Sequence, residues 1–261
     1  MSFRREKIRS CLQNARVRPP RWRSAFSLCW ALAPKLGRNR RPTTARSWLH
    51  LTAATQIGRP TSAAIRYHFW PSPACAPGMK VLDMGAGGGY STELMARAVA
   101  PGGIVYGQNP ADLPDGPKAT FEARLKTSAM KDVVADFRPF DDPVPPEVHD
   151  LDLVTFLFFY HDTTYMPVDR AEMDRKLFAA LKPGGLLLIA DHSALPGQGT
   201  SVGKTLHRIE ESTLRKEVEA AGFHLVAEGN FWRNPADTHD FPSYRPGMPV
   251  DNFVLKFQKP R

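Results

Sequence analysis

A glycine-rich turn directly after a short apolar strand constrains this chain more than any other feature of its sequence. Residues 80–84, Lys-Val-Leu-Asp-Met, are typical of a short buried strand, and glycines follow at positions 85, 87 and 89. Glycines in such a turn let the backbone approach a ligand closely at the carboxyl edge of a parallel sheet. The turn therefore predicts an α/β fold with a nucleotide-like cofactor.

The rest of the chain alternates strands and helices. Further strands are expected at residues 103–107, 151–159 and 185–190. Helices are expected at residues 92–99, 169–181 and 210–221. Lys182-Pro183-Gly184-Gly185 should stop the second helix, and residues 223–228 and 253–258 should form a closing antiparallel pair. This alternation indicates a doubly wound, mostly parallel sheet.

Charge divides the chain into two parts. Residues 1–77 contain 13 Arg and 2 Lys but a single acid, Glu6, for a net charge of +14, whereas the whole chain carries +9. Residues 78–261 are therefore net acidic, at −5. A basic footprint for nucleic acid should lie on the folded domain that reads it, so we expect no nucleic-acid partner.

Residues 1–77 show no sustained helical or alternating pattern. We interpret them as a basic, Arg/Pro-rich extension that is either disordered or translated out of frame, and residues 78–261 as the folded domain. Resequencing the gene would separate these two alternatives. Residues 21–33 resemble a short signal-peptide core, but no apolar run reaches the roughly 20 residues that span a bilayer. We therefore expect a cytoplasmic protein with no membrane partner.

Three signatures, in order along the chain, carry a family resemblance. They are Asp83-x-Gly85-x-Gly87-x-Gly89, Leu151-Asp152-Leu153-Val154, and Leu181-Lys182-Pro183-Gly184-Gly185 with residues 186–191. Together they resemble the class I S-adenosylmethionine-dependent methyltransferases over most of residues 79–258. Residues 159–166, with Asp191-His192-Ser193, resemble an uncharacterised bacterial subgroup of predicted methyltransferases. The resemblance implies a seven-stranded Rossmann-like sheet with a terminal antiparallel strand, and S-adenosyl-L-methionine as cofactor.

The resemblance also implies which residues bind the cofactor. The residues expected along its methionine and ribose portions are Asp83, Gly85, Ala86, Gly87 and Gly89. The acid that normally grips the ribose hydroxyls should fall at position 108 or 109, where this chain has Gln108 and Asn109. Asn109 can still hydrogen-bond a hydroxyl, though less strongly than a carboxylate. Asp136 and Phe137 are expected at the adenine end.

Four polar residues are the candidates for catalysis. They follow the strands predicted at 151–159 and 185–190 and should meet at the carboxyl edge of the sheet: His161, Asp162, Asp191 and His192. A sulfonium donor already carries an activated methyl group, so few catalytic residues are needed. We expect these four to act as acid, base or substrate contacts, with His161 as a base oriented by a neighbouring aspartate.

His207 and Arg208 are weaker candidates, because they follow a glycine-containing loop that can cover a substrate. No tight ligand spacing supports a metal ion, and we expect no metal site.

The favoured function is methylation of a small molecule, with the acceptor and the oligomeric state left open. Alternatives are a protein or nucleic-acid methyltransferase, a non-catalytic or impaired cofactor-binding protein, and an NAD-dependent oxidoreductase. An NAD fingerprint would place glycine or alanine at position 90, where this chain has Tyr90. No Asn-Pro-Pro-Tyr-like signature of base methylation follows the strand that ends at Phe159.

Overall fold

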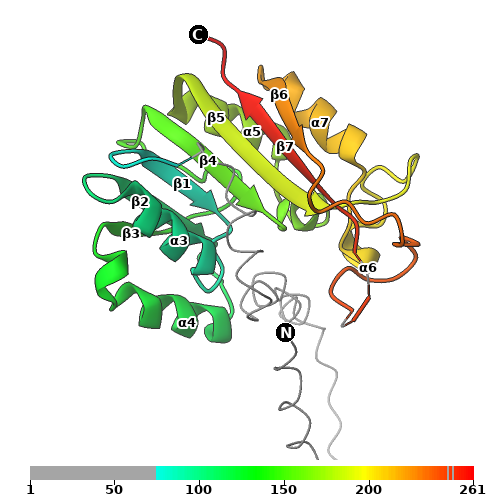
Figure 1. The fold of residues 1–261 in the computed structure, drawn as a ribbon, viewed down its shortest axis with the longest axis horizontal. Helices are drawn as coiled ribbons and strands as arrows, with labels where there is room; N and C mark the ends of the chain where they lie inside the picture. Colours follow the sequence, from blue (N-terminus) through cyan, green and yellow to red (C-terminus); the bar gives the residue numbers. More distant parts are fainter. Residues whose placement is uncertain (1–74, 246, 249) are drawn as a thin grey trace, which may run out of the picture. The chain divides into compact units, whose positions relative to one another are not determined.

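A single sheet of seven strands organises the domain. The computed structural model describes residues 75–261, apart from residues 246 and 249. The strand order is β3-β2-β1-β4-β5-β7-β6 (Figure 1). The strands are β1 (Lys80–Met84), β2 (Ile104–Asn109), β3 (Val133–Phe137), β4 (Leu151–Leu157), β5 (Leu181–His192), β6 (His224–Gly229) and β7 (Asn252–Gln258). Strands β3, β2, β1, β4 and β5 are parallel, whereas β7 is antiparallel to both β5 and β6. The predicted mostly parallel sheet with its closing antiparallel pair is confirmed.

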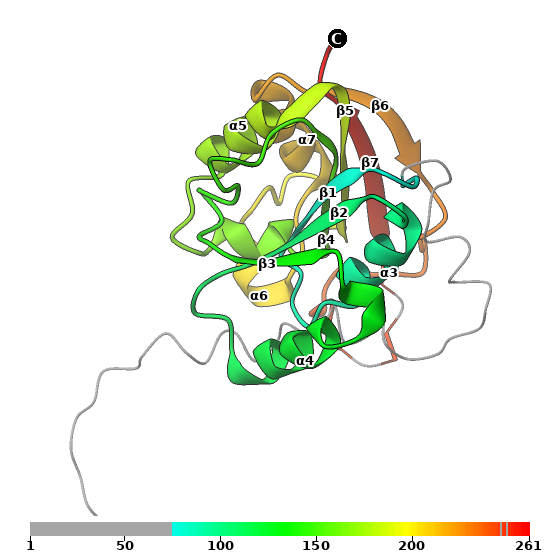
Figure 2. The ribbon, with the colours of Figure 1, turned by 90° about the vertical axis from the view of Figure 1, so that its left-hand side faces the viewer.

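Helices cover both faces of the sheet. They are α3 (Tyr90–Val99), α4 (Asp115–Leu125), α5 (Arg170–Ala180), α6 (Gly203–Leu206) and α7 (Glu211–Ala220), with short 3-10 helices η2 (Ser128–Met130) and η3 (Tyr160–Thr164). Seen along the sheet, α5 and α7 lie on one face and α3 on the other (Figure 2). Two apolar clusters, one on each side of the strands, make up the core.

The predicted extension falls almost wholly on residues outside the described part, so its interpretation stays a prediction. Within residues 75–261, no helix is both long and apolar enough to cross a membrane.

The boundary between α5 and β5 differs from the prediction. The helix starts as expected, because the side chain of Asp169 accepts a hydrogen bond from the backbone of Glu172 at 2.9 Å. It ends at Ala180, one residue early, and Leu181 already pairs with Leu151 in the sheet. The predicted stop signal at 182–185 therefore lies inside β5, as an irregularity where the register shifts.

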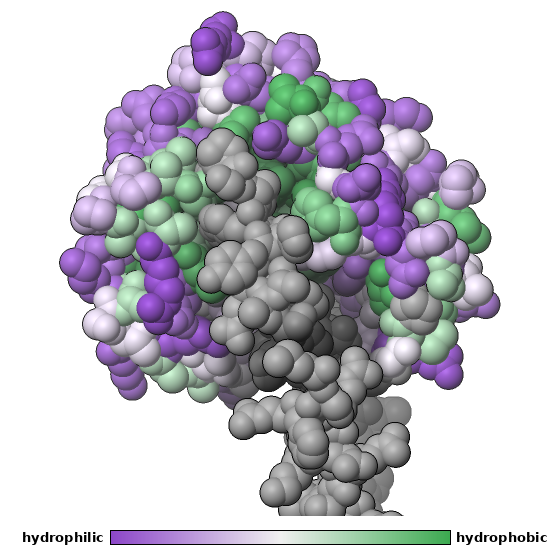
Figure 3. All heavy atoms as spheres, viewed as in Figure 1, coloured by the Kyte–Doolittle hydropathy of each residue, from purple (hydrophilic) through white to green (hydrophobic). Residues whose placement is uncertain are grey.

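On the face drawn in Figure 3, hydrophilic and hydrophobic residues of the described part are mixed. The exposed large apolar side chains are Ile104, Val134, Phe137, Leu195, Val226, Phe231 and Met248. They are spread over several strands and loops, which is normal for a folded domain.

A buried polar network joins α5 and α7 beneath the sheet. The Tyr160 hydroxyl lies 2.9 Å from Asp174 Oδ2 and 3.0 Å from Glu217 Oε2, and Arg170 pairs with Glu217. One hydroxyl proton cannot satisfy two carboxylates, and among the described residues Asp174 Oδ1 has no partner. A protonated Asp174 removes this conflict, because its carboxyl group can donate a hydrogen bond to the Tyr160 hydroxyl. The hydroxyl is then free to donate its own hydrogen bond to Glu217. Burial accordingly raises the pKa of Asp174 to about 7, assisted by the charge of Glu217.

Replacing Asp174 by asparagine should change how stability depends on pH. Because the folded-state pKa of Asp174 is raised, the native domain loses stability as pH rises from about 4 to about 7. Asparagine resembles the protonated acid and does not titrate, so the variant should keep its stability over this pH range. Asp174→Asn should therefore match the wild type at pH 4.5 and exceed its unfolding free energy by about 1–4 kcal/mol at pH 8, as measured by urea denaturation. Parallel pH profiles for the two proteins would contradict the assignment, and Asp132→Asn, at an exposed position, is the control.

Candidate functional site

The glycine-rich loop leaves β1 at the carboxyl edge and is held by the end of β2. Gly85 N–H donates to Gln108 Oε1 at 3.0 Å, and Gly87 N–H donates to Asn109 Oδ1 at 2.8 Å. The side-chain amide of Asn109 also donates to the carbonyl of Gly87 at 3.2 Å. Both amide side chains are fully buried. The loop is thus braced by side chains of the protein itself.

This bracing gives Asn109 a role besides its expected contact with the ribose. Both ends of its amide hydrogen-bond to the backbone of Gly87, and the side chain is fully buried. Asn109 therefore shapes the loop, and its contact with a ribose hydroxyl stays a prediction. Sequence reasoning identified the position but not the partner, because the partner is backbone.

Asp83 has a similar supporting role. Its carboxylate accepts hydrogen bonds from the hydroxyls of Ser91, Thr92 and Thr155, at 2.7, 2.7 and 2.9 Å. Burial raises the pKa of Asp83, and the three hydroxyls act in the opposite direction. The residue ties β1 to the start of α3 and to β4, and so fixes the position of the loop.

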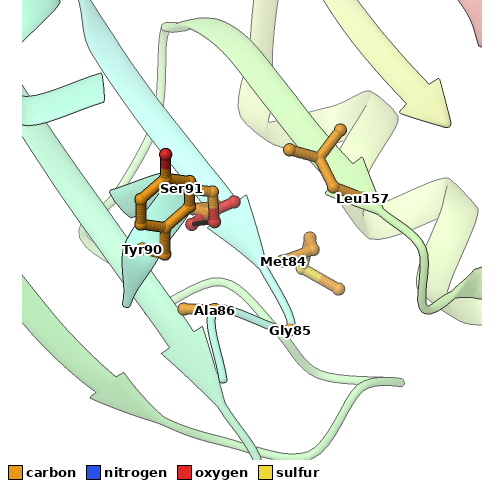
Figure 4. A pocket seen from close by; sticks show the side chains of 7 residues that line it. Met84, Gly85, Ala86, Tyr90, Ser91 and Leu157 are labelled. Atoms are coloured by element: carbon orange, nitrogen blue, oxygen red, sulfur yellow. Dashed lines mark hydrogen bonds between the residues drawn. The ribbon is translucent and has the colours of Figure 1, made fainter. Parts of the chain in front are cut away.

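A pocket opens beside this loop. It is lined by Asp83, Met84, Gly85, Ala86, Tyr90, Ser91 and Leu157. Figure 4 shows Tyr90 and Ser91 on one side of the pocket and Leu157, from the end of β4, on the other. Of the expected cofactor residues, Asp83, Gly85 and Ala86 therefore line this pocket together with the end of β4, whereas Gly87 and Gly89 do not.

The pair expected at the adenine end lies where β3 ends. Phe137 is half-exposed and packs edge-on against Phe121 of α4, with ring centroids 6.3 Å apart. Asp136 is buried, and Asp136 Oδ2 has no hydrogen-bond partner among the residues the structure describes. Burial raises the pKa of Asp136 to about 6. A buried acceptor without a donor is a natural contact for a ligand amino group or hydroxyl.

The four catalytic candidates meet at the ends of β4 and β5. His161 and Asp162 lie in η3, and Asp191 and His192 are the last two residues of β5 rather than residues after it. His161 Nδ1 lies 2.6 Å from Asp191 Oδ1, and His161 Nε2 lies 3.1 Å from Asp162 Oδ1. The side chain of Phe159 packs against Gly85, which links this cluster to the glycine loop.

The surroundings of His161 argue against its expected role as a base. Burial alone would lower the pKa of His161, but the carboxylates of Asp162 and Asp191 outweigh burial and raise that pKa to about 10. The imidazole is therefore a cation at neutral pH, with both ring nitrogens donating to carboxylates. A base must be able to accept a proton, so His161 is better placed to position its neighbours.

His192 is the neutral imidazole of the cluster. Burial, together with the positive charge of His161, lowers the pKa of His192 to about 4. Its Nδ1 lies 2.5 Å from the amide oxygen of Asn252, which requires a proton on Nδ1 and leaves Nε2 unprotonated. Phe158, held at a left-handed φ of 57°, stacks on the ring at 5.0 Å.

The two weaker candidates, His207 and Arg208, lie in different surroundings. His207 caps α6 and joins the cluster: His207 Nδ1 lies 2.9 Å from Asp162 Oδ1 and 3.3 Å from His161 Nε2. Arg208 points away and is fully buried in an ion pair with Asp237. Arg208 is therefore a structural residue. Sequence reasoning missed Tyr165, whose hydroxyl lies 2.5 Å from Asp162 Oδ1.

Comparisons with known proteins bear on this arrangement. No family model matches the chain. The chain is 26% identical over 181 residues to the ubiquinone/menaquinone biosynthesis C-methyltransferase UbiE of Vibrio vulnificus, strains YJ016 and CMCP6. The match covers 69% of this chain and 62% of the relative, so the chain spans less than two thirds of these relatives' length.

Solved structures share the fold at low sequence identity. A SAM-dependent methyltransferase from Aquifex aeolicus aligns with a TM-score of 0.53 and 16% identity, over 80% of this chain and 97% of the other. The [4+2]-cyclase SpnF aligns with a TM-score of 0.56 and 14% identity, over 81% and 94%. The fold alone therefore does not settle the reaction. The sequence match to a curated methyltransferase and the shared architecture nevertheless agree with the three sequence signatures, and all three observations point to a class I S-adenosylmethionine-dependent methyltransferase fold.

Proposed function

We propose that this protein transfers a methyl group from S-adenosylmethionine to a small molecule held beside the cluster at the ends of β4 and β5. The observation that carries the proposal is the glycine loop, which two buried amides hold open at the carboxyl edge of the sheet. Ligands of open α/β sheets bind at this edge.

The residues at this edge fit the cofactor. The unpartnered Asp136 Oδ2 offers an acceptor to the amino group or hydroxyls of an adenosine, and the half-exposed Phe137 offers an apolar surface beside it. The loop from Gly85 to Gly89 would hold the methionine and ribose portions. When bound, S-adenosylmethionine supplies a methyl group already activated on a sulfonium.

The remaining task for the protein is to orient an acceptor and exclude water. Leu157 lines the pocket beside the loop, and the buried Phe159 packs against Gly85, so both add apolar surface next to the loop. His192, with an unprotonated Nε2, is the side chain best able to accept a proton or a hydrogen bond from an acceptor. Asp191 orients the ring of His161, which donates to its carboxylate, and also accepts a hydrogen bond from the backbone of His192.

Burial and charge favour a small acceptor over a polymer. His161, Asp162, Asp191 and His192 are all at least nine-tenths buried. Residues 78–261 are also net acidic, which disfavours nucleic acid.

The experiment has two stages. Calorimetric titration with S-adenosylhomocysteine tests the cofactor site in the wild type, Asp136→Ala and the control Asp132→Ala. Loss of a hydrogen bond to a carboxylate should weaken binding by about 10- to 100-fold in Asp136→Ala only. The absence of binding in the wild type would refute the proposal.

The second stage tests the acceptor. Methyl-labelled S-adenosylmethionine is incubated with the protein and with small-molecule, protein or nucleic-acid fractions of a bacterial lysate. Label should enter the small-molecule fraction. Binding without transfer to any fraction would favour the non-catalytic alternative, and label in either polymer would redirect the substrate class.

Replacing Asn109 by aspartate distinguishes loop bracing from ribose binding. A carboxylate cannot donate to the carbonyl of Gly87, so the loop should lose a hydrogen bond and gain a repulsion. We expect the affinity for S-adenosylhomocysteine to fall about 10-fold. If position 109 instead grips the ribose, the added charge should tighten binding. The same calorimetric titration shows whether the affinity for S-adenosylhomocysteine falls or rises.

A further inference from the structure

We propose that His161, Asp162 and His207 form a binding site for a divalent transition-metal ion, with zinc as the ion that the ligand set suits best. One nitrogen from each histidine and one carboxylate oxygen all lie within 4.8 Å of one another, and all three residues are buried. Sequence spacing gave no indication of this site, because 46 positions separate His161 from His207. The proposal is independent of the methyl-transfer reaction.

The spacing of the three ligand atoms matches a shared ion. His161 Nε2, Asp162 Oδ1 and His207 Nδ1 are separated by 3.1, 2.9 and 3.3 Å. Ligands about 2.0–2.1 Å from a tetrahedral zinc ion lie about 3.3 Å apart. Small outward shifts would therefore admit the ion.

Hydrogen bonding alone accounts poorly for this cluster. Asp162 Oδ1 is approached by His161 Nε2, by His207 Nδ1 and by the Tyr165 hydroxyl at 2.5 Å. Three donors then compete for one carboxylate oxygen, which has two lone pairs. An ion between the two nitrogens and the oxygen removes the competition.

The residues around the three ligands hold those ligands in position. His161 Nδ1 donates to Asp191 Oδ1 at 2.6 Å, and the backbone N–H of His161 donates to Asp191 Oδ2 at 2.8 Å. This arrangement aims Nε2 at the centre, as carboxylates do for metal-bound histidines. α6 packs directly on η3, since a Cβ at Gly203 would lie 3.0 Å from the carbonyl oxygen of His161. That contact brings His207 to the site.

Charge balance also favours a dication. Asp162 and Asp191 place two carboxylates in a buried space. A bound ion would displace the proton that His161 Nε2 carries without metal, so both imidazoles would then be neutral. A divalent ion compensates both carboxylates. Two histidines and one carboxylate leave a coordination position for water or a substrate atom, the composition of a catalytic zinc site.

The test measures metal binding directly, without cofactor. The full chain is stripped with a chelator and titrated with Zn²⁺ by calorimetry, and with Co²⁺ as a visible-absorption probe. The variants are His207→Ala and Asp162→Asn, and His149→Ala is the matched control, because His149 is an exposed histidine outside the cluster. Any binding by histidines and cysteines of residues 1–77 is common to all of these proteins and cancels in the comparison.

We expect one Zn²⁺ equivalent in the wild type and in His149→Ala, with affinity at least about 100-fold weaker in His207→Ala and Asp162→Asn. The Co²⁺ bands should be lost in the same two variants. Circular dichroism distinguishes loss of a ligand from loss of the fold. If the folded variants bind Zn²⁺ with the stoichiometry and affinity of the wild type, or if the wild type binds no equivalent that these substitutions remove, the proposal is overturned.

Discussion

Replacing Arg208 by methionine should lower the free energy of unfolding by about 3–5 kcal/mol, because it leaves a buried carboxylate without its partner. Arg208 Nη1 lies 2.7 Å from Asp237 Oδ2, and both side chains are fully buried. The guanidinium also donates to the carbonyls of Ser193 and Phe241. Arg208 therefore joins the end of β5 to the loop between β6 and β7. For a domain of this size, the melting temperature should fall by about 6–20 °C.

Two further variants isolate the cause of this loss. Arg215→Met removes an exposed ion pair with Glu219 and should change stability by no more than about 0.5 kcal/mol. Arg208→Met combined with Asp237→Asn removes the unpaired charge and should recover part of the loss. If the double variant recovers nothing, the backbone contacts of Arg208 carry the stability instead. Urea denaturation of the four proteins gives all of these values.

The predictable part of this fold is the part with a strong apolar pattern. Strands β1, β4 and β5 are buried on both faces and were predicted from continuous apolar runs. Helix α4 and strand β3 were not predicted, because α4 buries only Phe121 and β3 buries only Asp136. An edge strand and a surface helix show little periodicity, so no window of sequence reveals them.

The candidate site also has features that the sequence predicts and features that it does not. Topology brings together whatever follows neighbouring parallel strands, so the meeting of His161, Asp162, Asp191 and His192 could be predicted from strand ends. The protonation of His161 could not, because it depends on two carboxylates within 3.1 Å of the ring. The presence of His207 in the cluster could not be predicted either, because it depends on the packing of α6 against η3.

Replacing Gly89 by alanine should disable the cofactor loop. Gly89 begins α3 with a left-handed φ of 78°, and its N–H closes the loop onto the carbonyl of Ala86 at 2.8 Å. A Cβ at this position would lie 2.4 Å from Phe121 Cδ2, a contact that side chains do not tolerate. The left-handed backbone costs about 1–2 kcal/mol and the overlap about 1–3 kcal/mol more. We expect an unfolding free energy lower by about 2–5 kcal/mol and an affinity for S-adenosylhomocysteine at least about 10-fold weaker.

Gly102→Ala separates these two costs. Gly102 has a φ of 84°, but no atom of the described residues lies within 4 Å of its added Cβ. It should show the backbone cost alone and leave cofactor affinity unchanged, since it lies outside the loop. Phe121→Leu in the Gly89→Ala background should then restore part of the affinity by removing the overlapping ring atoms. Equal losses of stability in Gly89→Ala and Gly102→Ala, with affinity intact in both, would mean that Phe121 moves aside freely and that close packing of α4 on the loop is not what shapes the cofactor site.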